Sequence, residues 1–271
     1  MKPIRLTVAV TAALLGAPLL LAQTVQPASA PAAFPLLKTT AGVRQTVLSN
    51  GLTVLIKEVR GAPVVSVQVF YKIGSRNEAP GVNGIAHQLE HLLFKGTKSR
   101  PVQFGRLPGA LGADFNAFTS YDQTAYHETV ERGKAGAALA LEADRMVNAQ
   151  IGEGKLTGER RVVLSKIEGN ENDPQYRLSR AVQAAAFPNS PYGLTVGGTK
   201  KDIEGFSADR VRANHQKYYS PEYATLVVVG GFGTDAMLAE ADVVLHFSHA
   251  RNSPGHTRPA VGSTSSGGPR G

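Results

Sequence analysis

The chain has 271 residues and contains no cysteine. It therefore forms no disulfide, holds no metal through thiolates and has no cysteine nucleophile. With 42% hydrophobic residues, it still has enough apolar side chains for one large buried core or two small ones. Any catalytic or metal site must be built from other side chains, histidine and carboxylate above all.

Acidic residues are fewer than basic ones, and the formal net charge is +8. Such a surplus of positive charge can mark a protein that binds nucleic acid. Here the Lys and Arg residues are scattered, and they lack the clusters interleaved with aromatic residues that a nucleic-acid surface carries. We expect no nucleic-acid partner.

Long hydrophobic runs are absent except at the N-terminus. Lys2 and Arg5 precede an apolar run over 6–22, and residues 28–30 read Ala-Ser-Ala, a typical cleavage site. This pattern predicts a signal peptide over 1–30 and an exported protein, periplasmic or secreted. The alternative is an uncleaved anchor, which is less favoured because the run is short for a bilayer span. After removal of the leader we expect no stable membrane insertion.

Strand patterns follow a short linker. Residues 31–42 are rich in alanine and proline and are predicted to join the leader to a domain over 43–245. Within 44–59, alternating apolar residues on both sides of Asn50-Gly51 predict a β-hairpin with a two-residue turn. Further strands are predicted at 64–73, 115–120, 123–130 and 225–229.

Helical spacing of apolar residues occurs in four segments: 85–95, 133–151, 157–168 and 175–187. Hairpins mixed with blocks of helices predict an α+β fold, with a largely antiparallel sheet packed with helices on one side. Residues 246–271 are rich in Ser, Gly and Pro, and this composition predicts a disordered tail.

The pentapeptide His87-Gln88-Leu89-Glu90-His91 is the strongest chemical signal. Residues four apart lie on one face of an α-helix, roughly 5–6 Å from each other, so both imidazoles can bind one Zn²⁺. Glu90 lies close enough to take a proton from a metal-bound water. This inverted pattern, H-x-x-E-H, is a metallopeptidase signature. Taken alone, it also fits an ordinary pair of surface histidines, but the apolar neighbours predict a largely buried helix.

Five longer segments resemble the N-terminal catalytic domain of the pitrilysin/insulinase family of zinc metallopeptidases. In chain order they are GVNGIAHQLEHLLFKGTKSRP, FNAFTSYDQTAYHETV, ERRVVLSKIEGNENDP, PYGLTVGGTKKDI and YYSPEYATLVVVG. The resemblance spans about 43–231 and implies a single pitrilysin-like domain that hydrolyses peptides or small unfolded proteins. It also implies that His87 and His91 are zinc ligands, Glu90 the general base and Glu159 a supporting acid.

The same resemblance implies that Asn116 and Ala117 lie on the edge strand against which the family holds its peptide substrate. Strand addition of this kind tolerates many sequences, because main-chain hydrogen bonds supply most of the binding. For Asn116, a polar residue that merely flanks a turn is an equally good interpretation.

The third zinc ligand is where the chain departs from the family pattern. In the family a glutamate stands seven residues after the Glu of a Glu-Arg-x-x-Val segment. Counted from Glu159, that position is Lys166, and a protonated lysine has no lone pair and repels Zn²⁺. Glu168 should face away, about 200° round the helix, and Glu159 lies about 10 Å along the axis. Two hypotheses stay open: a zinc endopeptidase, or a catalytically impaired peptide-binding or partner subunit of the same fold.

Length is the second departure. Family members carry two homologous domains, or pair with a partner chain, and close them over the peptide. The resemblance therefore implies a second homologous domain or subunit as a partner. After about Ala241 the apolar periodicity is lost, and this predicts a truncated or frameshifted end.

Overall fold

The computed structural model describes residues 38–40 and 42–249. The predicted signal peptide, most of the linker and most of the predicted tail lie outside the described residues. The strands are β1 (Lys38–Thr40), β2 (Val43–Val47), β3 (Thr53–Glu58), β4 (Val64–Tyr71), β5 (Asp114–Thr119), β6 (Thr124–Glu131) and β7 (Ala224–Gly230). The α-helices are α1 (Ile85–Leu92), α2 (Arg106–Ala110), α3 (Ala135–Asn148), α4 (Glu153–Glu171), α5 (Pro174–Ala186), α6 (Lys200–Gly205), α7 (Ala208–Tyr218) and α8 (Thr234–His249).

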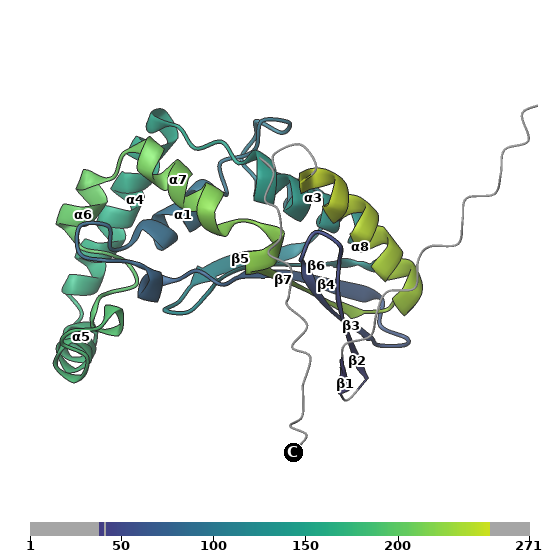
Figure 1. The fold of residues 1–271 in the computed structure, drawn as a ribbon. Helices are drawn as coiled ribbons and strands as arrows, with labels where there is room; N and C mark the ends of the chain where they lie inside the picture. Colours follow the sequence, from purple (N-terminus) through teal and green to yellow (C-terminus); the bar gives the residue numbers. More distant parts are fainter. Residues whose placement is uncertain (1–37, 41, 250–271) are drawn as a thin grey trace, which may run out of the picture. The chain divides into compact units, whose positions relative to one another are not determined.

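All seven strands form one sheet, in the order β1-β2-β3-β7-β4-β6-β5. Among the strand pairs of the described residues, only β3–β7 is parallel. Along β4 every second residue, from Val65 to Tyr71, is buried, whereas the residues between them are half-exposed. Figure 1 shows α1, α3, α7 and α8 along one face of this sheet, with α4, α5 and α6 farther out. The predicted α+β fold with helices on one side is confirmed.

The first hairpin differs from its prediction in the turn. The Leu48 N–H donates to Leu52 O and the Gly51 N–H donates to Leu48 O, both at 2.9 Å. Three residues therefore separate the bonded pair, instead of the two that Asn-Gly predicts. Gly51 has φ 90°, the left-handed conformation that three-residue hairpin loops place at their last position.

The helix bounds differ from the predicted ones, and α1 and α3 are shorter than the predicted 85–95 and 133–151. Helix α4 is longer than 157–168 at both ends, and α8 continues past Ala241 to His249. Leu245, one turn after Ala241, is 2% exposed. The apolar spacing thus continues beyond the point at which the sequence predicts its loss. Helices α2, α6, α7 and α8 were not predicted; α2 and α6 are short, and α7 buries only Ala208, Val211 and His215.

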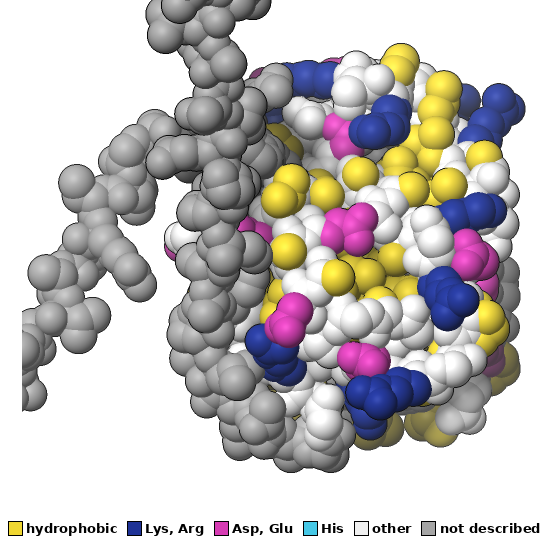
Figure 2. All heavy atoms as spheres, turned by 90° about the vertical axis from the view of Figure 1, so that its right-hand side faces the viewer, with side chains coloured by type: hydrophobic (Ala, Val, Ile, Leu, Met, Phe, Trp, Pro, Cys, Tyr) yellow, Lys and Arg dark blue, Asp and Glu magenta, His cyan; other side chains and the backbone are white. Residues whose placement is uncertain are grey.

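The outer face of α8 is partly apolar. Figure 2 shows the side of the molecule that lies to the right in Figure 1, where hydrophobic side chains gather between scattered charged ones. On α8, Val243 is 58% exposed, although Leu238 and Ala241 of the same helix are buried. Within the described ranges, no helix is both long enough and apolar enough to cross a membrane.

Candidate catalytic site

Helix α1 carries the pentapeptide, and a buried carboxylate holds its N-terminus. The helix begins after Gly84, which offers no side-chain cap. Instead, Glu78 accepts hydrogen bonds from the Gly84 N–H at 2.7 Å and the Ala86 N–H at 2.9 Å. A carboxylate at this end of a helix is favoured by the helix dipole. Burial raises the pKa of Glu78, and the hydrogen bonds from Ala86 and Gly84 oppose that rise.

A close backbone contact fixes the same end of α1 to a distant segment. Gly84 has φ 92°, and a Cβ on it would lie 2.6 Å from the Cα of Gly198. Next to it, the Asn83 side-chain amide donates to Thr195 O at 2.7 Å and to Glu78 at 2.9 Å. The glycine and asparagine just before the pentapeptide therefore serve to place the helix.

The two histidines lie together, as their spacing predicts. The ring centroids of His87 and His91 are 4.8 Å apart, with the rings edge to face. Nδ1 of His91 lies 3.3 Å from one carboxylate oxygen of Glu159, and the other oxygen forms an ion pair with Lys95 at 2.6 Å. Both oxygens of Glu159 are thus engaged. A proton on Nδ1 of His91 can bond to Glu159, which leaves Nε2 of that ring free to bind a ligand.

Glu90 is held by a strand rather than by its own helix. It is 9% exposed, and its Oε2 accepts a hydrogen bond from the Thr119 hydroxyl of β5 at 2.7 Å. The Thr124 hydroxyl of β6 lies 3.4 Å from the Thr119 hydroxyl and donates to Ile73 O at 3.0 Å. The orientation of the Glu90 carboxylate is therefore tied to the end of β5.

Lys166 is exposed on α4, between the buried residues Val163 and Ile167. Its positive charge still acts on the site. The pKa of His87 falls to about 4, first because of burial, then because of His91 and Lys166. Glu168 pairs instead with Lys200, at 3.6 Å. The structure brings His87, Glu90, His91 and Glu159 together and does not add a second carboxylate from α4.

Zinc hydrolases use three protein ligands and keep one position for water. In the described part of the chain, no group of three or more His, Asp or Glu side chains is arranged to hold a metal ion. Nδ1 of His87 is buried and has no hydrogen-bond partner among the described residues. The two histidines thus fit two ligands of a zinc ion, but the residues present do not fit a complete three-ligand site.

Strand β5 forms one edge of the sheet, next to α1. The Ser120 N–H donates to Gln123 O at the hairpin end, and bonded pairs alternate along an antiparallel ladder. The N–H and C=O of Ala117 therefore point away from β6, toward the open edge. The exposed Asn116 side chain lies on the opposite face of the sheet from Thr119, and its Oδ1 accepts a hydrogen bond from the Ala117 N–H at 2.9 Å.

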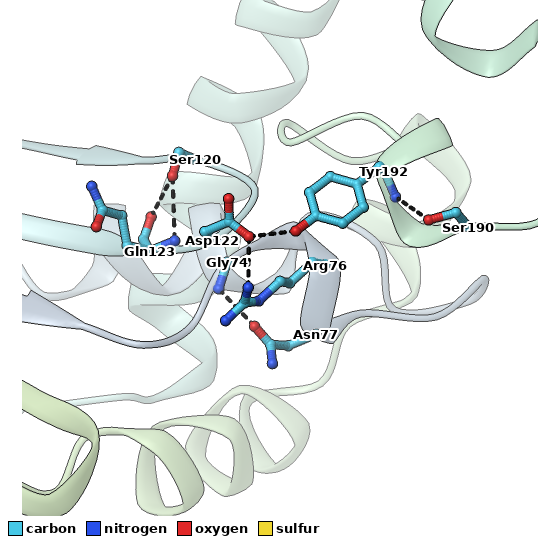
Figure 3. A network of polar contacts seen from close by, with 8 residues as sticks. All are labelled: Gly74, Arg76, Asn77, Ser120, Asp122, Gln123, Ser190 and Tyr192. Carbon is cyan, nitrogen blue, oxygen red and sulfur yellow. Dashed lines mark hydrogen bonds and ion pairs between the residues drawn. The ribbon is translucent and has the colours of Figure 1, made fainter. Parts of the chain in front are cut away.

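The tip of the β5–β6 hairpin is fixed by a polar network (Figure 3). Asp122 accepts hydrogen bonds from Arg76 at 2.8 Å and from the Tyr192 hydroxyl at 2.6 Å. Tyr192 belongs to a short helical turn, η3 (Pro191–Gly193). The backbone N–H of Tyr192 donates to the Ser190 hydroxyl at 3.3 Å. These contacts join the hairpin, and with it the edge strand, to the two neighbouring segments that carry Arg76 and Tyr192.

Sequence reasoning missed three residues that support the site. Lys95 lies four residues after His91, so helical spacing could have indicated it. Thr119 lies two residues after Ala117 on the same strand face, so strand alternation could have indicated it. Glu78 lies in a loop before α1, and no local pattern marks it.

Comparison with known protein families gives two matches. Residues 53–200, more than half of the chain, match the model described as insulinase (peptidase family M16). Residues 205–269 match the model described as the peptidase M16 inactive domain. The second match covers most of the segment that the sequence predicts to be a disordered tail.

Individual relatives agree with these matches. An uncharacterized zinc protease of Rickettsia bellii is 33% identical over 196 residues, which are 72% of this chain and 48% of that protein. The crystal structure of a protease from Helicobacter pylori is 30% identical with a TM-score of 0.71, over 80% of this chain and 53% of the other.

The periplasmic protease PqqL of Escherichia coli shares the fold, with a TM-score of 0.72 at 22% identity, over 83% of this chain and 26% of that one. The chain spans about half the length of the curated relatives that it matches. Its matched segments and its fold agree, and the chain belongs to the insulinase family of peptidases, M16.

Proposed function

We propose that this chain is a peptide-binding domain of the insulinase fold whose zinc site is incomplete, so that on its own it hydrolyses peptides poorly or not at all. One observation carries the proposal. The position that the family pattern gives to the third ligand is Lys166, whose charge adds to burial and to His91 in lowering the pKa of His87. A cation there opposes the binding of a second cation between His87 and His91.

Peptide binding rests on the edge strand. The outward C=O of Ala117, together with its N–H once this leaves the Asn116 side chain, offers main-chain hydrogen bonds to an extended segment, which adds to the sheet as a further strand. Asn116 and Ala117 are the residues that we assign to this contact. Because the main chain carries the contact, we expect wide tolerance of peptide sequence.

A second homologous domain or subunit is proposed as the partner. The matched relatives are about twice as long as the region that they share with this chain. Export to the periplasm or beyond is proposed from the leader pattern over 1–30, and the structural relative PqqL is described as periplasmic.

An active zinc endopeptidase is the second candidate. The observation that favours it is the support around the pentapeptide: Glu90 is held by Thr119, and His91 by Glu159. Under this second candidate, Glu90 is the general base, His87 and His91 are zinc ligands, and Zn²⁺ is the cofactor.

The test uses a fluorescent, extended peptide and measures both its binding and its cleavage. Proline at 117 removes the outward N–H, which an edge strand tolerates, so Ala117→Pro should weaken binding by about tenfold or more. Equal binding by Ala117→Pro and the unmodified chain would contradict strand addition. Cleavage by the unmodified chain that Glu90→Gln abolishes would favour the endopeptidase.

A further inference from the structure

One cavity lies apart from the candidate catalytic site. It has a volume of about 1240 Å³ and is formed by the end of α3, the start of α4 and the C-terminal half of α7. Neither the pentapeptide nor Ala117 lines it. Met146, Ile151 and Tyr219, all buried, contribute apolar surface to its wall. The cavity is large enough for a small-molecule ligand.

The charge of the lining is mostly positive. Lys98, Lys155, Arg212 and Lys217 contribute to it, against one carboxylate, Glu222. Arg212 pairs with Asp209. In the described part of the chain, none of the three lysines forms a salt bridge. The cavity therefore carries positive charge that neighbouring carboxylates do not neutralise.

Three of these cationic residues meet at one loop, 148–152. The Lys155 ammonium donates to the Gln150 side chain at 2.5 Å, and Arg212 donates to Ile151 O at 2.9 Å. The backbone N–H of Lys98 donates to Asn148 O at 2.9 Å. Burial, and then the charge of Lys95, lowers the pKa of Lys155. Both effects are expected where positive charge is crowded and partly desolvated.

The start of α4 adds donors at the same place. This 19-residue helix begins after Gly152, which has no side-chain cap. In the first turn, the Glu153 carboxylate accepts a hydrogen bond from the Ala208 N–H at 2.7 Å. Space is open beside Gly152 and Gly154, where no heavy atom would lie within 4 Å of an added Cβ. The first N–H groups of a helix have no partner within it, and together with the helix dipole they favour a negative charge.

We propose that this cavity binds a small anion with at least two negative charges, held by Lys98, Lys155 and Lys217 at the start of α4. Phosphate and carboxylate groups share the chemistry that these donors recognise. The site is separate from the peptide contact proposed on β5, because the two share no residue.

Isothermal titration calorimetry of the full chain with pyrophosphate and with citrate tests the proposal, at constant ionic strength set with sodium chloride. We expect one-to-one binding of at least one anion with a submillimolar Kd. The variant Lys98→Gln/Lys217→Gln should weaken binding at least tenfold, since both side chains are exposed and their loss leaves the core intact. Binding of pyrophosphate alone indicates a phosphate ligand, and binding of citrate alone a carboxylate ligand.

The matched control is Lys57→Gln/Lys201→Gln, which removes two exposed lysines outside the cavity. This control should bind as the unmodified chain does, and thermal unfolding should show that both variants are folded. The proposal is overturned if neither anion binds, or if the control loses as much affinity as the cavity variant.

Discussion

Helices α1 and α4 both contribute to the candidate site, but the surrounding protein constrains them differently. Helix α1 is held at its N-terminus by Glu78, and its Glu90 and His91 bond to Thr119 and Glu159. Helix α4 buries only four side chains along its 19 residues, and Glu159 is the one among them that reaches the site. Lys166 is exposed, although it lies seven residues after Glu159 and therefore on the same face of the helix.

This difference explains how position 166 can carry a residue that is not a zinc ligand while the domain keeps its fold. A change on the α1 side disturbs buried hydrogen bonds, which stabilise the domain whether or not it has activity. A change at position 166 places a different side chain in solvent and disturbs no packing. The contrast predicts large stability effects on the α1 side and small ones at Lys166.

The largest effect is expected from Gly84→Ala. Its φ is positive, and the added Cβ would lie 2.6 Å from the backbone of Gly198, so unfolding should become easier by more than about 3 kcal/mol. Gly158→Ala in α4 is the matched control, because nothing lies within 4 Å of its added Cβ. Urea unfolding measures both, and an equally small effect at the two glycines would remove the contrast.

The second-largest effect on stability is expected from acidification, through protonation of His87. Its pKa of about 4 lies below the ordinary 6.5, so the unfolded chain takes up the proton first as the pH falls. Stability should fall between pH 6.5 and 4, by up to about 3 kcal/mol from this group. In His87→Asn, denaturant unfolding over this range should depend less on pH. An identical dependence in both proteins would assign the effect to other groups.

Glu78→Gln should cost about 2 kcal/mol, because a neutral amide replaces the buried carboxylate that accepts two N–H groups of α1. Glu168→Gln, on exposed α4, should change the unfolding free energy by less than about 0.5 kcal/mol. Thermal and urea unfolding compare the two variants. The support assigned to Glu78 fails if they match.

The smallest effect on stability is expected at position 166 itself. Lys166→Gln should change the unfolding free energy by less than about 0.5 kcal/mol. It should nevertheless raise the pKa of His87, since it removes a positive charge that disfavours the protonated ring. An NMR titration of the His87 ring in metal-free protein measures this shift, and an unchanged pKa would show that the lysine does not reach the site.

Local patterns predicted much of this molecule. The spacing of His87 and His91 placed both rings on one helix face, and alternation placed β4 and the β5–β6 hairpin. The contacts that residues make across long sequence separations were not predictable in this way. Thr119 meets Glu90 only because β5 packs beside α1, and the backbone of Gly84 meets Gly198 more than a hundred residues later.

Other differences arose from weak patterns. Helix α7 is strongly polar, so its few buried residues gave no clear period. The Asn50-Gly51 pair predicted the hairpin correctly but not its three-residue loop, in which Gly51 takes the left-handed conformation at the last position. Strand β1 lies in the predicted linker and exists through its pairing with β2.

The central claim is that Lys166 leaves the zinc site incomplete, and the zinc content of the purified chain tests it most directly. Elemental analysis after dialysis against a fixed, low free zinc concentration should find clearly less than one zinc per unmodified chain. Lys166→Glu should bring the content close to one, because it supplies a third ligand and removes a repelling charge. One zinc per unmodified chain, together with peptide cleavage that Glu90→Gln abolishes, would contradict the account.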